Sequence, residues 1–276
     1  MNKNYITLIA GLPDIVWNDW KLPFPVRDFR AQAEIYINGR DADLLNMLFL
    51  RYDNQQILNL LNKMDTVHGT HDLDCVYPVS LLEEEVAEPT GALPPYLNEF
   101  ITKYKETAAG DELQDVQHAE RVLTGLYYEY MMTSGNEFLE DFAAFSMNVK
   151  NLVTALNCRK YGKDFTMEII GENEFSNALK SAHSKDFGLS AEHTWVEKVI
   201  AAVENNNLVE RERSLDLLVW DAIEEGMTFR YFSIERVLGF AAELLIVERW
   251  SKMDSESGRQ VFEEMIAKFK ENVTFG

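Results

Sequence analysis

The residues best suited to chemistry stand together in one short polar segment of the chain. His68 and His71 are three positions apart, and Asp72, Asp74 and Cys75 follow them closely. Imidazole, carboxylate and thiolate groups at such spacing match the ligand chemistry of zinc. The same composition is typical of a polar loop whose histidines face water, and the sequence holds no second cluster of this kind. We therefore favour the polar loop, and a metal-dependent helical enzyme is the third of three functional hypotheses.

Two other places could carry chemistry if helices position them well. Asp115 and His118 have the i,i+3 spacing of a helical di-iron pair, but that site requires a matching pair on a second helix. An exposed pair on a polar helix face is the simpler interpretation. Glu243 lies in the apolar stretch 238–247, where burial would raise its pKa and suit it to act as an acid or a base. A lone acid in such a stretch is more often an ion-paired or edge-facing structural residue.

The motifs of common nucleotide-binding and hydrolytic sites are absent. The sequence contains no G-x-x-x-x-G-K-[ST], G-x-G-x-x-G, H-E-x-x-H or G-x-S-x-G, and no EF-hand loop. This absence removes the commonest nucleotide-binding and hydrolase interpretations, and we predict no catalytic, cofactor-binding or metal-binding residues.

The composition is that of a folded and strongly acidic protein. The 276 residues include 26 Lys and Arg against 46 Asp and Glu, for a formal charge of −20, and 46% are hydrophobic. Such a chain is too apolar to be disordered, and its charge disfavours binding to nucleic acid or to anionic lipid. A basic protein partner is compatible with it. The acidic run Leu81–Glu85, with Glu88, is either a solvated face, which we favour, or part of a landing surface for such a partner.

The N-terminus faintly resembles a signal peptide, but the sequence disfavours both export and a membrane span. The apolar N-terminal stretch is about the minimum length of a signal peptide, and Asp14 follows it without a small-x-small cleavage site. The most apolar stretch, Val237–Val247, is far shorter than the ~20 residues of a membrane helix. Cys75 and Cys158 cannot form a disulfide framework. We expect a cytoplasmic protein with no membrane span of its own.

Long helices are predicted for most of the chain, so the fold class is all-α. All seven prolines occur in the first 95 residues, and an interior proline is what a long helix excludes. In the segment 136–161 apolar residues recur at steps of four and three, on one helical face, and Ser134 and Glu137 form a capping-box pattern at its start.

Strand candidates are limited to Tyr5–Ala10 and Phe165–Ile170. Other predicted helices cover residues 25–37, 41–52, 54–63, 95–107, 111–133, 190–205, 209–226, 233–252 and 255–272, with a loop-rich segment at 65–95. The five tryptophans are interpreted as core residues, at positions 17, 20, 195, 220 and 250.

Two segments of the chain are alike, Asp53–Leu61 and Asn148–Leu156. Each begins with Asp or Asn, has an amide residue three positions later (Gln56 or Asn151) and continues as an aliphatic helix. The pattern indicates a helical unit that its first residue caps and whose leucines pack inward. Two or three such units would bury a common core.

This repeat resembles the family of the C subunit of V-type and A-type rotary ATPases, whose eukaryotic V-ATPase members are called the d subunit. That family repeats Asp-x-x-Asn-Leu-x-x-x-Leu, typically followed by Arg-x-Lys and a glycine. The second segment matches it at Asn151, Leu152, Leu156 and Gly162, with Arg159 in place of the lysine. The two segments depart from the pattern at Asn148, Gln56 and Asn157. Residues 232–250 are similar to the family's last repeat, and Ile9–Asp14 looks like the opening of a divergent bacterial branch.

The resemblance implies a funnel-shaped, all-α protein with pseudo-threefold symmetry. We expect a single domain over residues 1–276, with three helical repeat units at about 1–108, 109–205 and 206–276. Members of the family sit on the membrane proteolipid ring and receive the foot of the central stalk, which the D and F subunits form. The implied role is that of a non-catalytic rotor component that couples ATP hydrolysis or synthesis to the transport of protons or other ions. Its place would be peripheral on the cytoplasmic membrane.

Two further expectations follow for the partners. Because the net charge is −20, we expect an acidic funnel that favours a basic stalk end. The second of the three functional hypotheses is a helical scaffold or adaptor unrelated to the ATPase.

Overall fold

The computed structural model describes residues 3–17, 19, 22–62, 74–107, 115–182 and 184–254, and this part of the chain is all-helical. It contains one 3-10 helix, η3 (Thr166–Glu168), and no strand. The α-helices are α1 (Lys3–Ala10), α2 (Val26–Glu34), α3 (Arg40–Leu61), α4 (Val79–Ala87), α5 (Pro95–Glu106), α6 (Val116–Met132), α7 (Glu137–Lys160), α8 (Glu174–Ser181), α9 (Trp195–Glu204), α10 (Leu208–Met227) and α11 (Ile234–Asp254). No described helix combines the length and the apolarity that crossing a membrane requires.

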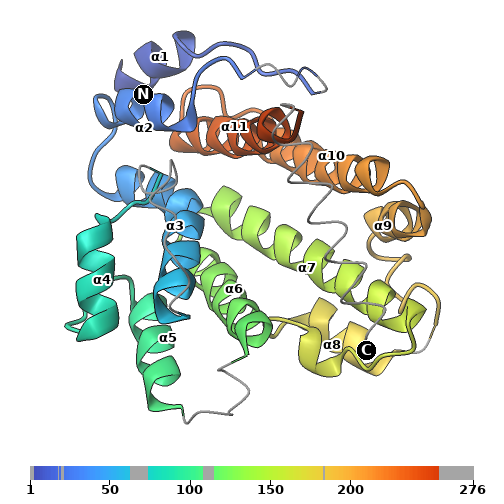
Figure 1. Ribbon diagram of the computed structural model, residues 1–276. Coiled ribbons are helices and arrows are strands. Elements are labelled where there is room, and N and C mark those ends of the chain that lie inside the picture. Colours follow the sequence, from blue (N-terminus) through green and yellow to red (C-terminus); the bar gives the residue numbers. More distant parts are fainter. Residues whose placement is uncertain are drawn as a thin grey trace.

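The helices α3, α7 and α11 begin close together and then diverge (Figure 1). At the start of α3, Arg40 donates to the backbone carbonyl of Gly135, just before α7, at 2.9 Å. At the start of α7, the Asn136 side chain donates to Glu235 on α11 at 2.8 Å. The N-terminal ends of all three long helices are therefore linked by polar contacts.

Two further helices lie between the three long ones. The packing runs from α3 to α6, then to α7, α10 and α11, and α11 packs back on α3. These five helices form a closed ring. One hydrophobic cluster joins α1–α6 with α11 and the adjoining ends of α7 and α10, and a second fills the space among α7, α8, α9 and α10.

The long helices hold the loops that precede short helices through buried polar side chains. On α3, Asp53 accepts hydrogen bonds from the backbone N–H groups of Val76 and Tyr77, both at 2.9 Å, just before α4. On α7, the Asn151 amide donates to the carbonyl of Ile170 at 2.8 Å and accepts from its N–H at 2.9 Å, ahead of α8. Because such buried backbone groups need partners, these two side chains fix where α4 and α8 begin.

Glu248 makes the corresponding contact on α11. Its carboxylate accepts a hydrogen bond from the backbone N–H of Val26, the first residue of α2, at 3.3 Å. Asp53, Asn151 and Glu248 are 98 and 97 positions apart in the sequence. The same kind of anchor therefore recurs on each long helix at a nearly regular interval.

The helix-entry role expected for Asp53 and Asn148 is wrong. Both residues lie inside long helices, and Asn148 instead accepts a hydrogen bond from Asn173, the N-cap of α8, at 2.9 Å. Gln56, which the sequence aligns with Asn151, is buried, and its Nε2 has no hydrogen-bond partner among the described residues. The anchoring role of Asn151 therefore belongs to Asp53 in the first segment.

Asn151→Ala is expected to lower the free energy of unfolding by about 1–3 kcal/mol, because it leaves the N–H and the carbonyl of Ile170 buried without their partner. Urea unfolding followed by circular dichroism measures this. The matched control is Asn177→Ala, which removes an exposed amide from α8 and should change little. An equal midpoint for both variants would contradict the anchoring role.

Both strand predictions are wrong. Tyr5–Ala10 forms most of α1, where Tyr5 and Leu8 are buried one turn apart, so the apolar run follows a helical period. Phe165–Ile170 contains η3, and the backbone of Ile170 pairs with the Asn151 side chain instead of a neighbouring strand.

Other helix boundaries also differ from the sequence prediction. The two helices expected at 41–52 and 54–63 are one helix, α3, which ends at Leu61; Lys63 lies outside the described residues. The loop-rich segment 65–95 includes α4. Helix α9 begins at Trp195 and not at Ser190, and α8 was not anticipated. At the start of α7 the capping residue is Asn136, whose side chain accepts the N–H of Leu139 at 3.1 Å, and not Ser134. The helix expected at 255–272 lies outside the described residues.

Candidate functional site

The segment proposed as a metal site lies only partly within the described residues. Its members outside them are His68, His71 and Asp72. Asp74 is buried and Cys75 is half-buried, and their backbone carbonyls accept hydrogen bonds from Arg30 at 2.6 and 3.2 Å. Across the described part of the chain, no three His, Cys, Asp or Glu side chains gather as a metal site would require.

Asp115 and His118 form a helix cap. The Asp115 carboxylate accepts the backbone N–H of His118 at 2.9 Å, at the N-terminus of α6. Their i,i+3 spacing therefore reflects N-cap geometry, which is a structural role.

Glu243 is buried in α11, with 6% of its surface exposed. Burial raises its pKa to about 7, which the attraction of Arg236 opposes and the repulsion of Glu224 reinforces. The raised pKa expected from the sequence is therefore present in the folded protein.

In the acidic run at 81–85, some glutamate side chains are exposed and one is buried. Glu83 and Glu84 are exposed on α4. Glu85 is buried and accepts the backbone N–H groups of Thr90 and Gly91 at 3.0 and 3.1 Å. Glu85 thus holds the loop after α4, and only the exposed part of the run is open to a partner.

Of the four described tryptophans, two are buried and two are half-buried, which agrees with the expected core role. Trp220 and Trp250 are buried, and Trp17 contacts the Trp220 ring with centroids 5.4 Å apart. Trp195 is half-buried against the second hydrophobic cluster. Trp20 lies outside the described residues.

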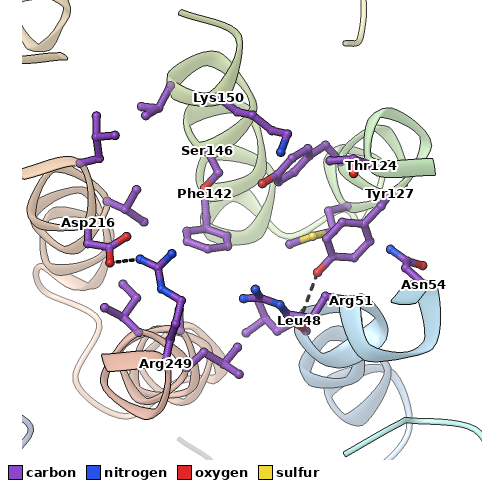
Figure 2. A pocket seen from close by; sticks show the side chains of 18 of the residues that line it. Leu48, Arg51, Asn54, Thr124, Tyr127, Phe142, Ser146, Lys150, Asp216 and Arg249 are labelled. Carbon is purple, nitrogen blue, oxygen red and sulfur yellow. Dashed lines mark hydrogen bonds and ion pairs between the residues drawn. The ribbon is translucent and has the colours of Figure 1, made fainter. Parts of the chain in front are cut away.

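A cavity of about 720 Å³ lies at the centre of the five-helix ring (Figure 2). On the three long helices its first lining residues are Leu48, Phe142 and Ala242, each more than one turn beyond the helix start. The cavity therefore lies where the long helices have begun to diverge, away from the end at which they meet.

Three cationic side chains line this cavity, one from each long helix. Figure 2 shows Arg51 on α3, Lys150 on α7 and Arg249 on α11 around the same space. They are 99 positions apart in the sequence, in both intervals. Together with the backbone anchors, they give the three long helices a common pattern.

Three acidic side chains also line the cavity, and all come from the two intervening helices. They are Glu120 on α6 and Glu212 and Asp216 on α10. The cavity therefore has as many cationic as acidic residues in its wall. The net charge of the chain is therefore not reflected in an excess of acids in the wall of this cavity.

The three cations differ in whether they are paired. Arg249 forms an ion pair with Asp216, which also accepts a hydrogen bond from the indole of Trp250 at 2.6 Å. Arg51 and Lys150 are both exposed, and neither has an ion pair with a described residue. Two positive charges thus face the cavity, and no carboxylate of the described residues is paired with either.

Neutral phenols surround Arg51. The Tyr127 hydroxyl donates to the backbone carbonyl of Met47 at 2.9 Å. Burial raises the pKa of both Tyr127 and Tyr128, although the nearby charge of Arg51 opposes the shift. These rings stay uncharged at neutral pH and do not offset the charge of Arg51.

A second feature is an exposed aromatic turn at residues 228–233, between α10 and α11. Phe229 is 83% exposed and Tyr231 66% exposed. Phe229 also has φ of 65°, a left-handed conformation that is costly for a residue with a side chain. Arg230 fixes the turn by donating to Glu137, at the start of α7, at 2.6 Å. The turn therefore presents exposed aromatic rings beside an arginine that is paired with α7.

Sequence reasoning did not find the cavity. The regular spacing of Arg51, Lys150 and Arg249 is present in the sequence, but single basic residues on helices form no motif. The spacing indicates a common site only once the three helices are known to line the same cavity.

The fold and the site define an all-helical protein organised around a central cavity. The chain belongs to the family described as protein of unknown function (DUF2764), whose model matches residues 1–273. No curated protein and no solved structure matches the chain.

Proposed function

We propose that this protein is a non-catalytic central-stalk component of a V/A-type ATPase, in the position that the C subunit holds. It would join the rotor shaft, made of the D and F subunits, to the membrane proteolipid ring, and so couple ATP hydrolysis or synthesis to ion transport. It would lie at the cytoplasmic face of the membrane through the complex, without a span of its own.

The observation that carries this proposal is the threefold recurrence around the cavity. Each of α3, α7 and α11 contributes one buried backbone anchor and one cavity-facing cation, at intervals of 97–99 residues. Such recurrence is expected of a chain built from three related units, which is the symmetry that the resemblance implies. If the stalk and this protein rotate together, the end of the stalk must sit in a central cavity whose lining side chains keep it from turning relative to this protein.

The aromatic turn supports a second binding surface. It stands at the end where the long helices meet, whereas the cavity lies farther along those helices. Exposed aromatic residues beside an arginine are typical anchors of protein interfaces. We assign the cavity to the stalk and the aromatic turn to the proteolipid ring.

Co-purification tests the proposal against the scaffold or adaptor alternative. The affinity-tagged protein, isolated from its own cells with mild detergent, is expected to bring down D, F and the proteolipid. Their absence at low and moderate salt would contradict the proposal and favour the adaptor. A metal analysis of the same sample tests the third hypothesis, which stoichiometric zinc or iron would revive.

The two surfaces can be separated by mutation. Phe229→Ala combined with Tyr231→Ala is expected to reduce recovery of the proteolipid at least about fivefold and to leave recovery of D and F unchanged, because it removes only the exposed rings. Quantitative mass spectrometry of the purified complexes measures both. Equal loss of all partners, or no loss of proteolipid, would contradict this assignment.

A further inference from the structure

We infer that Arg51 and Lys150 bind carboxylates of the segment that enters the central cavity, so that the inserted end of the stalk is acidic. This inference rests on the proposed function and specifies the chemistry of the partner. It reverses the expectation from net charge, in which an acidic protein receives a basic stalk.

The first support is the local charge at the cavity. In a chain with 20 more acidic than basic residues, carboxylates are abundant, yet Arg51 and Lys150 lack an ion pair with any described residue. Arg249, the third cation of the set, is already neutralised by Asp216. Two cations left open in one cavity favour an anionic group from outside the chain.

The second support is the arrangement of acids around the ring. The acidic lining residues come from α6 and α10, which flank α7. Helices α11 and α3 pack directly on each other, with no helix that carries a cavity-lining acid between them. Helix α3 also packs on α6, which carries Glu120, so the part of the wall without a lining acid is the side of α3 that faces α11. We place one carboxylate there, beside Arg51.

The size and the lining of the cavity favour a polypeptide over a small anion. One helical turn, about 10 Å across and 5.4 Å long, fills roughly 400 Å³. The cavity of about 720 Å³ thus accommodates at least one turn. Its wall includes apolar side chains such as Phe142, Val153 and Leu245, which an inorganic anion would leave unused. An amphipathic helical end with acidic side chains uses both parts of the wall.

Charge reversal at the two cations tests the inference. The double variant Arg51→Glu with Lys150→Glu is titrated with the D–F complex in a calorimeter, alongside the wild-type protein. We expect its Kd to rise at least about tenfold and to depend less on salt than the wild-type Kd. The matched control, Lys160→Glu with Lys198→Glu, changes the net charge equally at exposed positions outside the cavity and should change Kd less than about threefold.

The outcomes distinguish this inference from the proposed function. Both charged side chains are exposed, so thermal unfolding should be unchanged; Arg51→Gln with Lys150→Gln serves if the reversed variant does not fold. Equal Kd values for wild type, reversed variant and control would overturn the inference alone. Tighter binding by the reversed variant would show a basic stalk end, and displacement of D–F by inorganic phosphate would assign the cations to a small anion. No binding by the wild type would overturn both the inference and the proposed function.

Discussion

Leu152→Ala is expected to lower the free energy of unfolding by about 2–5 kcal/mol. Leu152 is fully buried on α7, in the hydrophobic cluster that joins α7 to α8, α9 and α10. The loss combines the transfer free energy of the deleted atoms with the cost of the cavity left behind, because packed neighbours relax only in part. Chemical denaturation at fixed temperature measures the change.

The control for this variant is Leu217→Ala on α10, where the side chain is 37% exposed and truncation should cost less than about 1 kcal/mol. The folded fraction of the Leu152 variant should keep its partners, since the side chain does not line the cavity. Unchanged stability with lost binding would show that Leu152 belongs to an interface.

Glu243→Gln is expected to stabilise the protein by about 3 kcal/mol at pH 8 and by little near pH 4.5. In the folded protein, burial raises the pKa of Glu243 to about 7, from the 4.5 of an unperturbed glutamate. Between these two values the unfolded chain loses a proton that the folded protein keeps. Stability from this group is therefore fully present below about pH 4.5 and lost as the pH rises to about 7.

The difference in unfolding free energy between Glu243→Gln and the wild type isolates the contribution of Glu243 from that of the other acids. Unfolding free energies of both proteins are measured from pH 4.5 to 8, and their difference should grow with pH and level off above about 7. Glu225→Gln, which removes an exposed carboxylate from α10, should give a flat difference. A flat difference for Glu243→Gln as well would mean that the carboxyl is solvated in the folded protein.

The sequence predicts α7, α10 and α11 to within two residues at each end, because the apolar period of each is unbroken. On the apolar face predicted for α7, Phe138, Val149 and Leu152 are buried, as expected. Phe142, Phe145 and Leu156, on the same face, are half-buried. The sequence predicts the short elements poorly. Helices α4 and α8 have 9 and 8 residues, and their starts are held by Asp53 and by Asn148 and Asn151 from a distant helix. Local sequence does not contain those tertiary hydrogen bonds.

The structural roles of polar residues are also hard to predict, because they depend on partners far away in the sequence. Asp53 is typical of a helix start by residue type, which divided α3 into two predicted helices. In the structure its carboxylate is satisfied by the loop before α4, so the helix continues through it. The pair Asp115 and His118 shows the reverse case, since a spacing suggestive of ligands is a simple cap. The cavity depends on how five helices pack around one space, and the apolar period of each helix does not determine that packing.

The proposed threefold construction is defined by its boundaries as well as by its anchors. Repeat units at about 1–108, 109–205 and 206–276 stay a prediction. Each of these proposed units contains one of the long helices α3, α7 and α11 with its backbone anchor.

The most direct test of the central claim is native mass spectrometry of the purified protein mixed with the D and F stalk subunits from the same cell. The proposed stalk function predicts a stable assembly with one copy each of this protein, D and F. The proteolipid ring would then be the next partner to add. A protein that stays alone across a range of salt concentrations would contradict it. The all-helical fold would stand, and the function would move to a scaffold or adaptor.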